Sequence, residues 1–131
     1  MKNSLIVKSE LKSLDNVYRW VEELLTDEVG RKKLRDILLI TQEMVTNSIL
    51  HGNEHSIDKK VTIDVEINLN DININIEDEG KGLKSLPSQE EAEELDYLAE
   101  NGRGLKLAVL MTKSIKLHGN KIKLIFTKGT K

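Results

Sequence analysis

The sequence predicts an α/β fold, a two-layer α/β sandwich in which helices cover one face of a mixed, mostly antiparallel sheet. In two segments between residues 11 and 49, apolar residues recur every three or four positions, which is the period of an amphipathic helix. Over residues 61–76 and 115–126, apolar and polar residues alternate, which is the period of a strand with one buried face. A chain of 131 residues has the length of one domain, here residues 1–131.

The first half of the chain is expected to hold a strand and two helices. Residues 5–8 predict a short strand, and the apolar stripe over residues 11–25 predicts a helix that Ser9 or Ser13 could cap. A second helix is expected over residues 31–52, because a glycine closes its apolar stripe. Both helices should pack on the apolar face of the sheet.

The second half is expected to hold two hairpins and one helix. Residues 61–69 and 72–76 should pair around an Asn70-Asp71 turn. A third helix is indicated near residues 105–111, and the hairpin 115–126 should close around a Gly-Asn turn.

The composition excludes several classes of function. The 20 basic and 22 acidic side chains nearly cancel, and one Trp, two Tyr and one Phe offer little surface for base stacking, so we expect no nucleic-acid partner. The absence of cysteine excludes a disulfide framework and a thiolate metal site. No apolar run is long enough for a secretion signal or a membrane span, so we expect a cytoplasmic protein without a membrane partner.

Five of the eight glycines fall within three short motifs that make sense together as one nucleotide site. Glycine is needed where the backbone adopts a positive φ or approaches a ligand closely. The motifs are Glu43-x-x-x-Asn47-x-x-x-His51-Gly52, Asp78-x-Gly80-x-Gly82 and Gly102-Arg103-Gly104-Leu105.

In the first motif, Glu43 and Asn47 are four residues apart and therefore project from the same face of the second helix. The Asn47 amide oxygen could be one protein ligand to Mg²⁺, and Glu43 could accept a proton from an attacking hydroxyl. The alternative interpretation is a solvated Glu and a polar residue near a helix end. His51 and His55 have the spacing of zinc ligands, but Gly52 interrupts the helix between them.

The other two motifs supply a base contact and a phosphate contact. Asp78 follows an alternating strand, where its carboxylate could accept a hydrogen bond from the exocyclic amine of adenine beside Gly80 and Gly82. A simple Asp-Glu-Gly turn is the alternative. Gly102-Arg103-Gly104-Leu105 opens a helix, whose N-terminal N–H groups can bind phosphate. The Walker signature is absent, so a P-loop is excluded.

Between these two glycine motifs, residues 83–101 follow neither period. The segment contains the only proline, Pro87, and an acidic run from Glu90 to Glu100. Its length and position predict a mobile ATP lid.

In this order, the motifs resemble those of the GHKL ATPases, and the compact chain is similar to the bacterial anti-sigma factor serine/threonine kinases. The resemblance covers essentially the whole chain. The matching stretches are the N box over residues 42–52, the first glycine box over residues 77–82, and the second glycine box with its helix over residues 101–112.

The resemblance implies a GHKL, histidine-kinase-like ATPase fold and a role for each motif. Asn47 resembles the Mg²⁺ ligand, Glu43 the catalytic carboxylate and Asp78 the adenine-binding aspartate. The remaining cofactor-binding positions, which resemble the hinge and phosphate loop, are Gly80, Gly82, Gly102, Arg103, Gly104 and Leu105. The cofactors implied are ATP and Mg²⁺.

Two positions depart from the family pattern. Lys113 stands where an acidic residue is usual, and Gly119-Asn120 stands where Gly-Thr is usual. Because that threonine helps to hold adenine in the wider superfamily, we expect its loss to weaken or reshape the base contact. Neither departure removes a group needed for phosphoryl transfer.

The resemblance implies an ATP-dependent protein serine/threonine kinase, an anti-sigma factor that phosphorylates an anti-anti-sigma antagonist and sequesters a sigma factor. A homodimer is compatible with this interpretation. The alternative is an ATP-binding regulatory module that captures a partner without kinase activity. A catalytic domain from a histidine kinase is disfavoured, because no helix bearing a phospho-accepting histidine precedes the predicted strand and helix.

Overall fold

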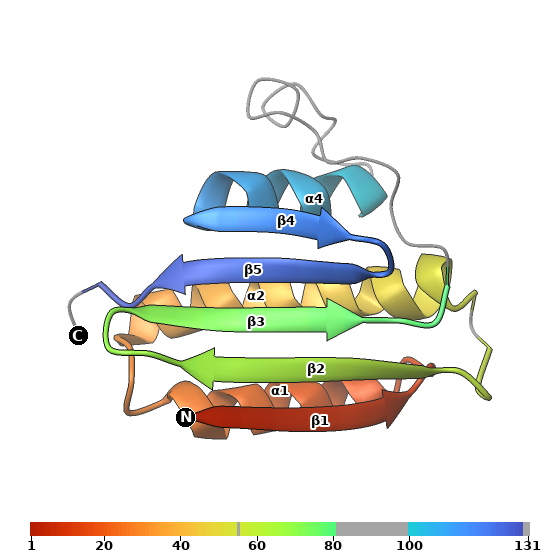
Figure 1. Cartoon of the computed structure of the whole chain (residues 1–131), viewed down its shortest axis with the longest axis horizontal. Coiled ribbons are helices and arrows are strands. Elements are labelled where there is room, and N and C mark those ends of the chain that lie inside the picture. Colours follow the sequence, from red (N-terminus) through yellow and green to blue (C-terminus); the bar gives the residue numbers. More distant parts are fainter. Residues whose placement is uncertain (55, 81–99, 130–131) are drawn as a thin grey trace.

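The computed structural model describes residues 1–54, 56–80 and 100–129, with the backbone alone for residues 100–105 (Figure 1). In chain order, its elements are β1 (Lys2–Lys8), α1 (Ser13–Leu25), α2 (Arg31–Asn47), the π-helical turn η1 (Ser48–Gly52), β2 (Lys60–Ile67), β3 (Asp71–Glu77), α4 (Glu100–Met111), β4 (Ser114–His118) and β5 (Lys121–Thr127).

The five strands form one sheet in the order β1-β2-β3-β5-β4. Every pairing among the described strands is antiparallel, so the expected two-layer α/β class is confirmed while the sheet is not mixed. Figure 1 shows α1 and α2 behind the sheet, on one face, with α4 along the β4 side. The other face of the sheet is not covered by any described helix.

The core lies between the sheet and the helices. Alternate residues of β2, β3 and β5 point inward, and α1, α2 and α4 contribute their apolar stripes. Full burial of one such side chain contributes about 1.5–3 kcal/mol. The fully buried members of this core include Val17, Val21, Leu25, Ile37, Ile40, Ile63, Ile72, Ile74 and Leu124.

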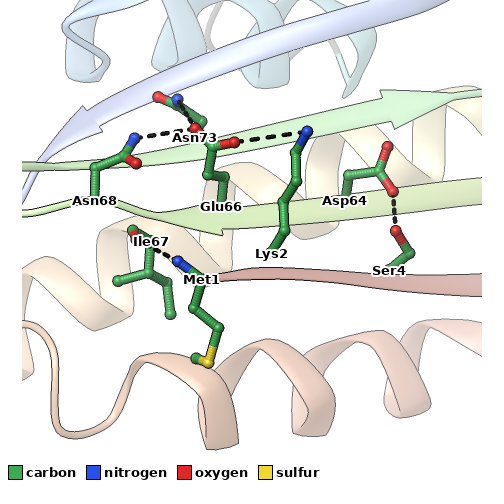
Figure 2. Close-up of polar contacts among 8 residues, drawn as sticks. All are labelled: Met1, Lys2, Ser4, Asp64, Glu66, Ile67, Asn68 and Asn73. Carbon is green, nitrogen blue, oxygen red and sulfur yellow. Dashed lines mark hydrogen bonds and ion pairs between the residues drawn. The ribbon is translucent and has the colours of Figure 1, made fainter.

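The opposite face of the sheet carries polar side chains that pair across strands. Figure 2 shows Lys2, Asn68 and Asn73 around the carboxylate of Glu66. Asn68 Nδ2 donates to Glu66 Oε1 at 3.2 Å, and Lys2 Nζ lies 3.8 Å from Oε2. The Asn68 hydrogen bond is the main cause of the lowered pKa of Glu66. Such exposed pairs contribute little to stability.

Several predicted boundaries shift. Neither Ser9 nor Ser13 caps α1: the helix begins at Ser13, and the preceding residue, Lys12, makes no side-chain cap. The Ser9 hydroxyl instead accepts a hydrogen bond from the distant Asn53. The first hairpin turns over residues 68–70, so Leu69 is 88% exposed outside the strand.

The second helix also differs from its prediction. The α-helix ends at Asn47, and the chain continues to Gly52 as a π-helical turn, a variation that apolar spacing does not reveal. Residues 83–99 of the expected lid lie outside the described residues, while Glu100 and Asn101 begin α4. None of the helices in the described ranges combines the length and apolar character needed to cross a membrane.

Candidate functional site

Asp78 is the centre of the candidate site. It follows the last residue of β3, and only 7% of its surface is exposed. Its carboxylate lies against Gly52 at the end of η1, where an added Cβ would meet Asp78 Oδ2 at 2.0 Å. The fold thus brings the first and second motifs into direct contact, and glycine at position 52 leaves the space that the carboxylate fills.

Gly80 is required by a second close approach. A Cβ at this position would lie 1.8 Å from the carbonyl oxygen of Gly52. Since that neighbour is backbone, it cannot move aside as the end of a flexible side chain could. Packing of the Asp78 loop on the η1 turn therefore explains Gly80 independently of any ligand.

The surroundings of Asp78 act on its pKa in opposite directions, and the net shift is upward. Burial is the largest influence and raises the pKa of its carboxyl group, and the neighbouring Glu77 acts in the same direction. Hydrogen bonds from the Gly80 backbone N–H, at 2.8 Å, and from the Ser48 hydroxyl oppose this rise, as does Lys59. The result is a carboxylate that is poorly hydrated and held by two donors.

The backbone around Asp78 is joined to the closing hairpin through Asn120. The Asp78 N–H donates to the Asn120 carbonyl oxygen at 3.0 Å, and the Asn120 side-chain amide donates to the Asp78 carbonyl oxygen. From its sequence, Asn120 is predicted to be a turn residue and a departure from a family pattern, not a contact of Asp78. Its contact is with the backbone of the candidate base-binding residue.

Glu43 and Asn47 lie one turn apart near the end of α2, and both are partly exposed. Asn47 precedes Ser48, whose hydroxyl donates to Asp78, so the predicted metal ligand is the sequence neighbour of a residue in the site. Ser48 is not among the predicted site residues. Its contact with Asp78 joins residues 30 positions apart, so only the folded chain shows it.

The third motif lies at the start of α4. Gly102, Arg103, Gly104 and Leu105 have helical backbone within Glu100–Met111, whereas Gly82 lies outside the described residues. In Figure 1, the start of α4, the η1 turn and the end of β3 all lie toward the same end of the molecule. The backbone therefore gathers parts of all three motifs at one end of the sandwich.

The family model of the histidine kinase-like ATPase domain matches residues 7–128. The chain belongs to the histidine kinase-like ATPase domain family. This match confirms the GHKL resemblance drawn from the three motifs.

Relatives of this histidine kinase-like ATPase domain include clostridial anti-sigma F factors. That of Clostridium perfringens strain SM101 is 34% identical over 105 residues, which cover 76% of this chain and 69% of the relative. That of Clostridium botulinum strain Eklund 17B is 40% identical over 55 residues, covering 42% of this chain and 38% of the relative. A second C. botulinum strain, Alaska E43, gives the same identity and coverage. The predicted similarity to anti-sigma factors is confirmed.

An ATPase domain of this family binds ATP, and the residues of the site fit parts of that ligand. Asp78 offers a buried acceptor to a base amine, and the first turn of α4 carries backbone N–H groups that could bind phosphate. Among the described residues, no group of three or more His, Asp or Glu side chains could hold a metal. A divalent cation at Asn47 would thus depend on phosphate and water oxygens, which is usual for Mg²⁺.

Proposed function

We propose that this chain is an ATP- and Mg²⁺-dependent anti-sigma factor that phosphorylates a serine or threonine of an antagonist protein. The observation that carries the proposal is the similarity to anti-sigma F factors over 76% of the chain, with Asp78, Gly52 and Gly80 packed into one buried contact. A cytoplasmic location accompanies the proposal, because ATP and sigma factors are found there.

The proposed reaction assigns a task to each of the three motifs, and two tasks to the first. Asp78 accepts a hydrogen bond from the adenine amine, and the free backbone N–H groups of the first turn of α4 contact the phosphates. Asn47 would hold Mg²⁺, which neutralises charge on the phosphates. The substrate hydroxyl oxygen attacks the γ-phosphorus, the bond to the β–γ bridging oxygen breaks, and ADP leaves. Glu43 accepts the proton released by the hydroxyl.

The chain itself supplies positioning and charge rather than covalent chemistry, as phosphoryl transfer requires. Glu43 and Asn47 share one face of α2, so a proton acceptor and a metal ligand can act on the same phosphate group. The buried Asp78 lies beyond the end of that helix, where it can contact the base. Because the three residues have separate tasks, substitution of each is expected to affect a different property: transfer rate, Mg²⁺-dependent binding or binding of the base.

The proposed partners are an anti-anti-sigma protein, which is the phosphoryl acceptor, and a sigma factor, which is sequestered. The similarity to clostridial anti-sigma F factors supports the sigma factor as a partner. The antagonist follows from the kinase assignment, because a protein kinase of this kind needs a hydroxyl-bearing substrate.

The test is phosphate transfer from ATP to an anti-anti-sigma protein of the same cell, measured beside ATP affinity and partner capture. Glu43→Gln should keep ATP affinity but lower the transfer rate by about 10²–10⁴, the usual range for loss of a general base. Asn47→Ala should weaken Mg²⁺-dependent binding and transfer together. Glu23→Gln is the matched control, because Glu23 is an exposed residue of α1.

Two outcomes contradict the kinase assignment. If the wild-type chain binds no ATP at millimolar concentration, the whole proposal fails. If wild type and Glu43→Gln transfer no phosphate but capture a sigma factor in the presence of ATP, the chain is the ATP-gated binding module that the sequence analysis left open.

A further inference from the structure

The peptide group between Asp78 and Glu79 is held by two asparagine side chains from distant parts of the chain. Its carbonyl oxygen accepts a hydrogen bond from Nδ2 of Asn120, in the β4–β5 turn. Its N–H donates to Oδ1 of Asn53, just after η1, at 2.7 Å. The peptide lies beyond the end of β3, where no ladder partner remains for its polar groups. The side-chain amides of Asn53 and Asn120 therefore take the place of the backbone hydrogen bonds that a neighbouring strand would supply.

Asn53 is fully buried, and both polar atoms of its side chain form hydrogen bonds. Nδ2 donates to Ser9 Oγ at 2.6 Å and to the Lys60 carbonyl oxygen at 3.0 Å, while Oδ1 accepts from the Glu79 N–H. The Lys60 oxygen can only accept and the Glu79 N–H can only donate. An amide in this one orientation satisfies both, whereas a carboxylate of the same shape would face the Lys60 oxygen without a hydrogen.

The orientation of this peptide controls the Asp78 carboxylate. The Gly80 N–H, which belongs to the next peptide group, donates to Asp78 Oδ1 at 2.8 Å. A rotation of the Asp78–Glu79 peptide would displace that donor and release the side chain toward other rotamers. The space is also tight, because Gly80 packs on the backbone of Gly52, the residue before Asn53. Asn53 and Gly52 thus hold the peptide and the carboxylate from the same turn of chain.

We propose that Asn53 and Asn120 are positioning residues that fix the direction in which Asp78 accepts a hydrogen bond from a purine amine. The inference rests on the proposed function, since it requires Asp78 to contact the base. Neither asparagine touches the nucleotide in this account. Both act through Asp78, and their effect is selectivity for a base that carries a 6-amine over one that lacks it.

The experiment compares the affinity for ATP with that for purine riboside triphosphate, which has hydrogen in place of the 6-amine. Asn120→Ala removes one side-chain donor and keeps the backbone bond to Asp78. Asn53→Asp replaces Nδ2, which donates to Ser9 Oγ and to the Lys60 carbonyl oxygen, by an oxygen atom that cannot donate. Each variant should lose about two- to tenfold in ATP affinity, the value of one hydrogen bond, and leave the analogue unchanged. Asn70→Ala and Asn70→Asp, in the exposed β2–β3 turn, are the matched controls.

Far-UV circular dichroism and a thermal melt first establish that each variant is folded. If the buried Asn53→Asp variant does not fold, the partly exposed Asn120→Ala decides alone. Equal loss for both nucleotides, or no loss for either, overturns the positioning role while the proposed function stands. A wild-type chain that binds ATP and the analogue equally refutes the base contact of Asp78 and the inference with it. A wild-type chain that binds neither refutes the proposed function itself.

Discussion

The contact between Gly52 and Asp78 predicts that Gly52→Ala destabilises the wild-type protein but stabilises an Asp78→Ala variant. A Cβ at Gly52 would lie 2.0 Å from Asp78 Oδ2, whereas ordinary contact begins at 3.4 Å, so the carboxylate oxygen must move by about 1.4 Å (3.4 − 2.0). Because the whole carboxylate group must move with this oxygen, the hydrogen bonds that Asp78 accepts from the Gly80 N–H, at Oδ1, and from the Ser48 hydroxyl are disrupted. Gly52→Ala should therefore lower the free energy of unfolding by about 1–3 kcal/mol, the usual range for overpacking.

In an Asp78→Ala background the obstacle is absent. Gly52 does not have a positive φ, so alanine fits its backbone without strain. Alanine also reduces the conformational entropy of the unfolded chain, which is worth about 0.4–1 kcal/mol. Gly52→Ala should thus stabilise the Asp78→Ala protein, and the two substitutions should be coupled by about 1.4–4 kcal/mol, which is the cost in one background plus the gain in the other.

The measurement is urea unfolding of the four proteins at pH 7, followed by circular dichroism, with equal slopes checked before the free energies are compared. The reasoning is refuted if Gly52→Ala costs the same free energy in both backgrounds. That result would mean that the η1 turn, and not the Asp78 carboxylate, limits the space at position 52.

Four further predictions concern the same region. Asp78→Asn should weaken ATP binding about ten- to a hundredfold in calorimetry, because a hydrogen bond to a charged group is lost; unchanged affinity would place the base elsewhere. Burial raises the pKa of Asp78 in the folded protein above its ordinary value of 3.8, so between the unfolded-state and folded-state pKa values the native protein binds more protons than the unfolded protein. The free energy of unfolding should therefore fall as the pH rises from the lower to the higher of these pKa values, and this fall should be absent in Asp78→Asn. Urea unfolding at successive pH values tests this. Gly80→Ala should cost more than Gly52→Ala in the same melts, because its Cβ would meet backbone at 1.8 Å; a smaller cost would show that the loop can shift. Gly119→Ala should lower the free energy of unfolding by about 1–2 kcal/mol, because its φ is 65° and nothing lies within 4 Å of the added Cβ, so backbone strain is the only cost. Gly119→Asn should cost less, because asparagine tolerates a positive φ better than alanine; equal costs would show that backbone strain does not decide the effect.

The sheet could be predicted because its pattern is local. Alternation of apolar and polar residues fixed the faces of β2 and β3, and the turn at Gly119 has the positive φ that glycine favours. The glycines of the three motifs suggested one nucleotide site, and the order of the motifs, which resembles a known family, made that interpretation specific. Spacing alone also allowed a plain turn at Asp78.

The contacts that complete the site could not be predicted, because they join residues far apart in the chain. Ser9 was expected to cap a helix, but its hydroxyl accepts from Asn53, 44 residues away. Gly80 was expected to admit a ligand, and its close neighbour is the Gly52 backbone. A single sequence carries no record of such pairs, since serine, asparagine and glycine are common in any turn.

The strand order has a consequence for folding kinetics. β2 with β3 and β4 with β5 are local hairpins, whereas β3 pairs with β5 over separations of 44 residues at Glu77↔Lys121 and 56 at Asp71↔Thr127. Closing such long loops is slow, so the joining of the two hairpins should follow their separate formation. The bonds between Asp78 and Asn120 extend that seam by one position. Capacity to bind nucleotide should therefore arise late in refolding, at the moment when the two halves of the sheet meet.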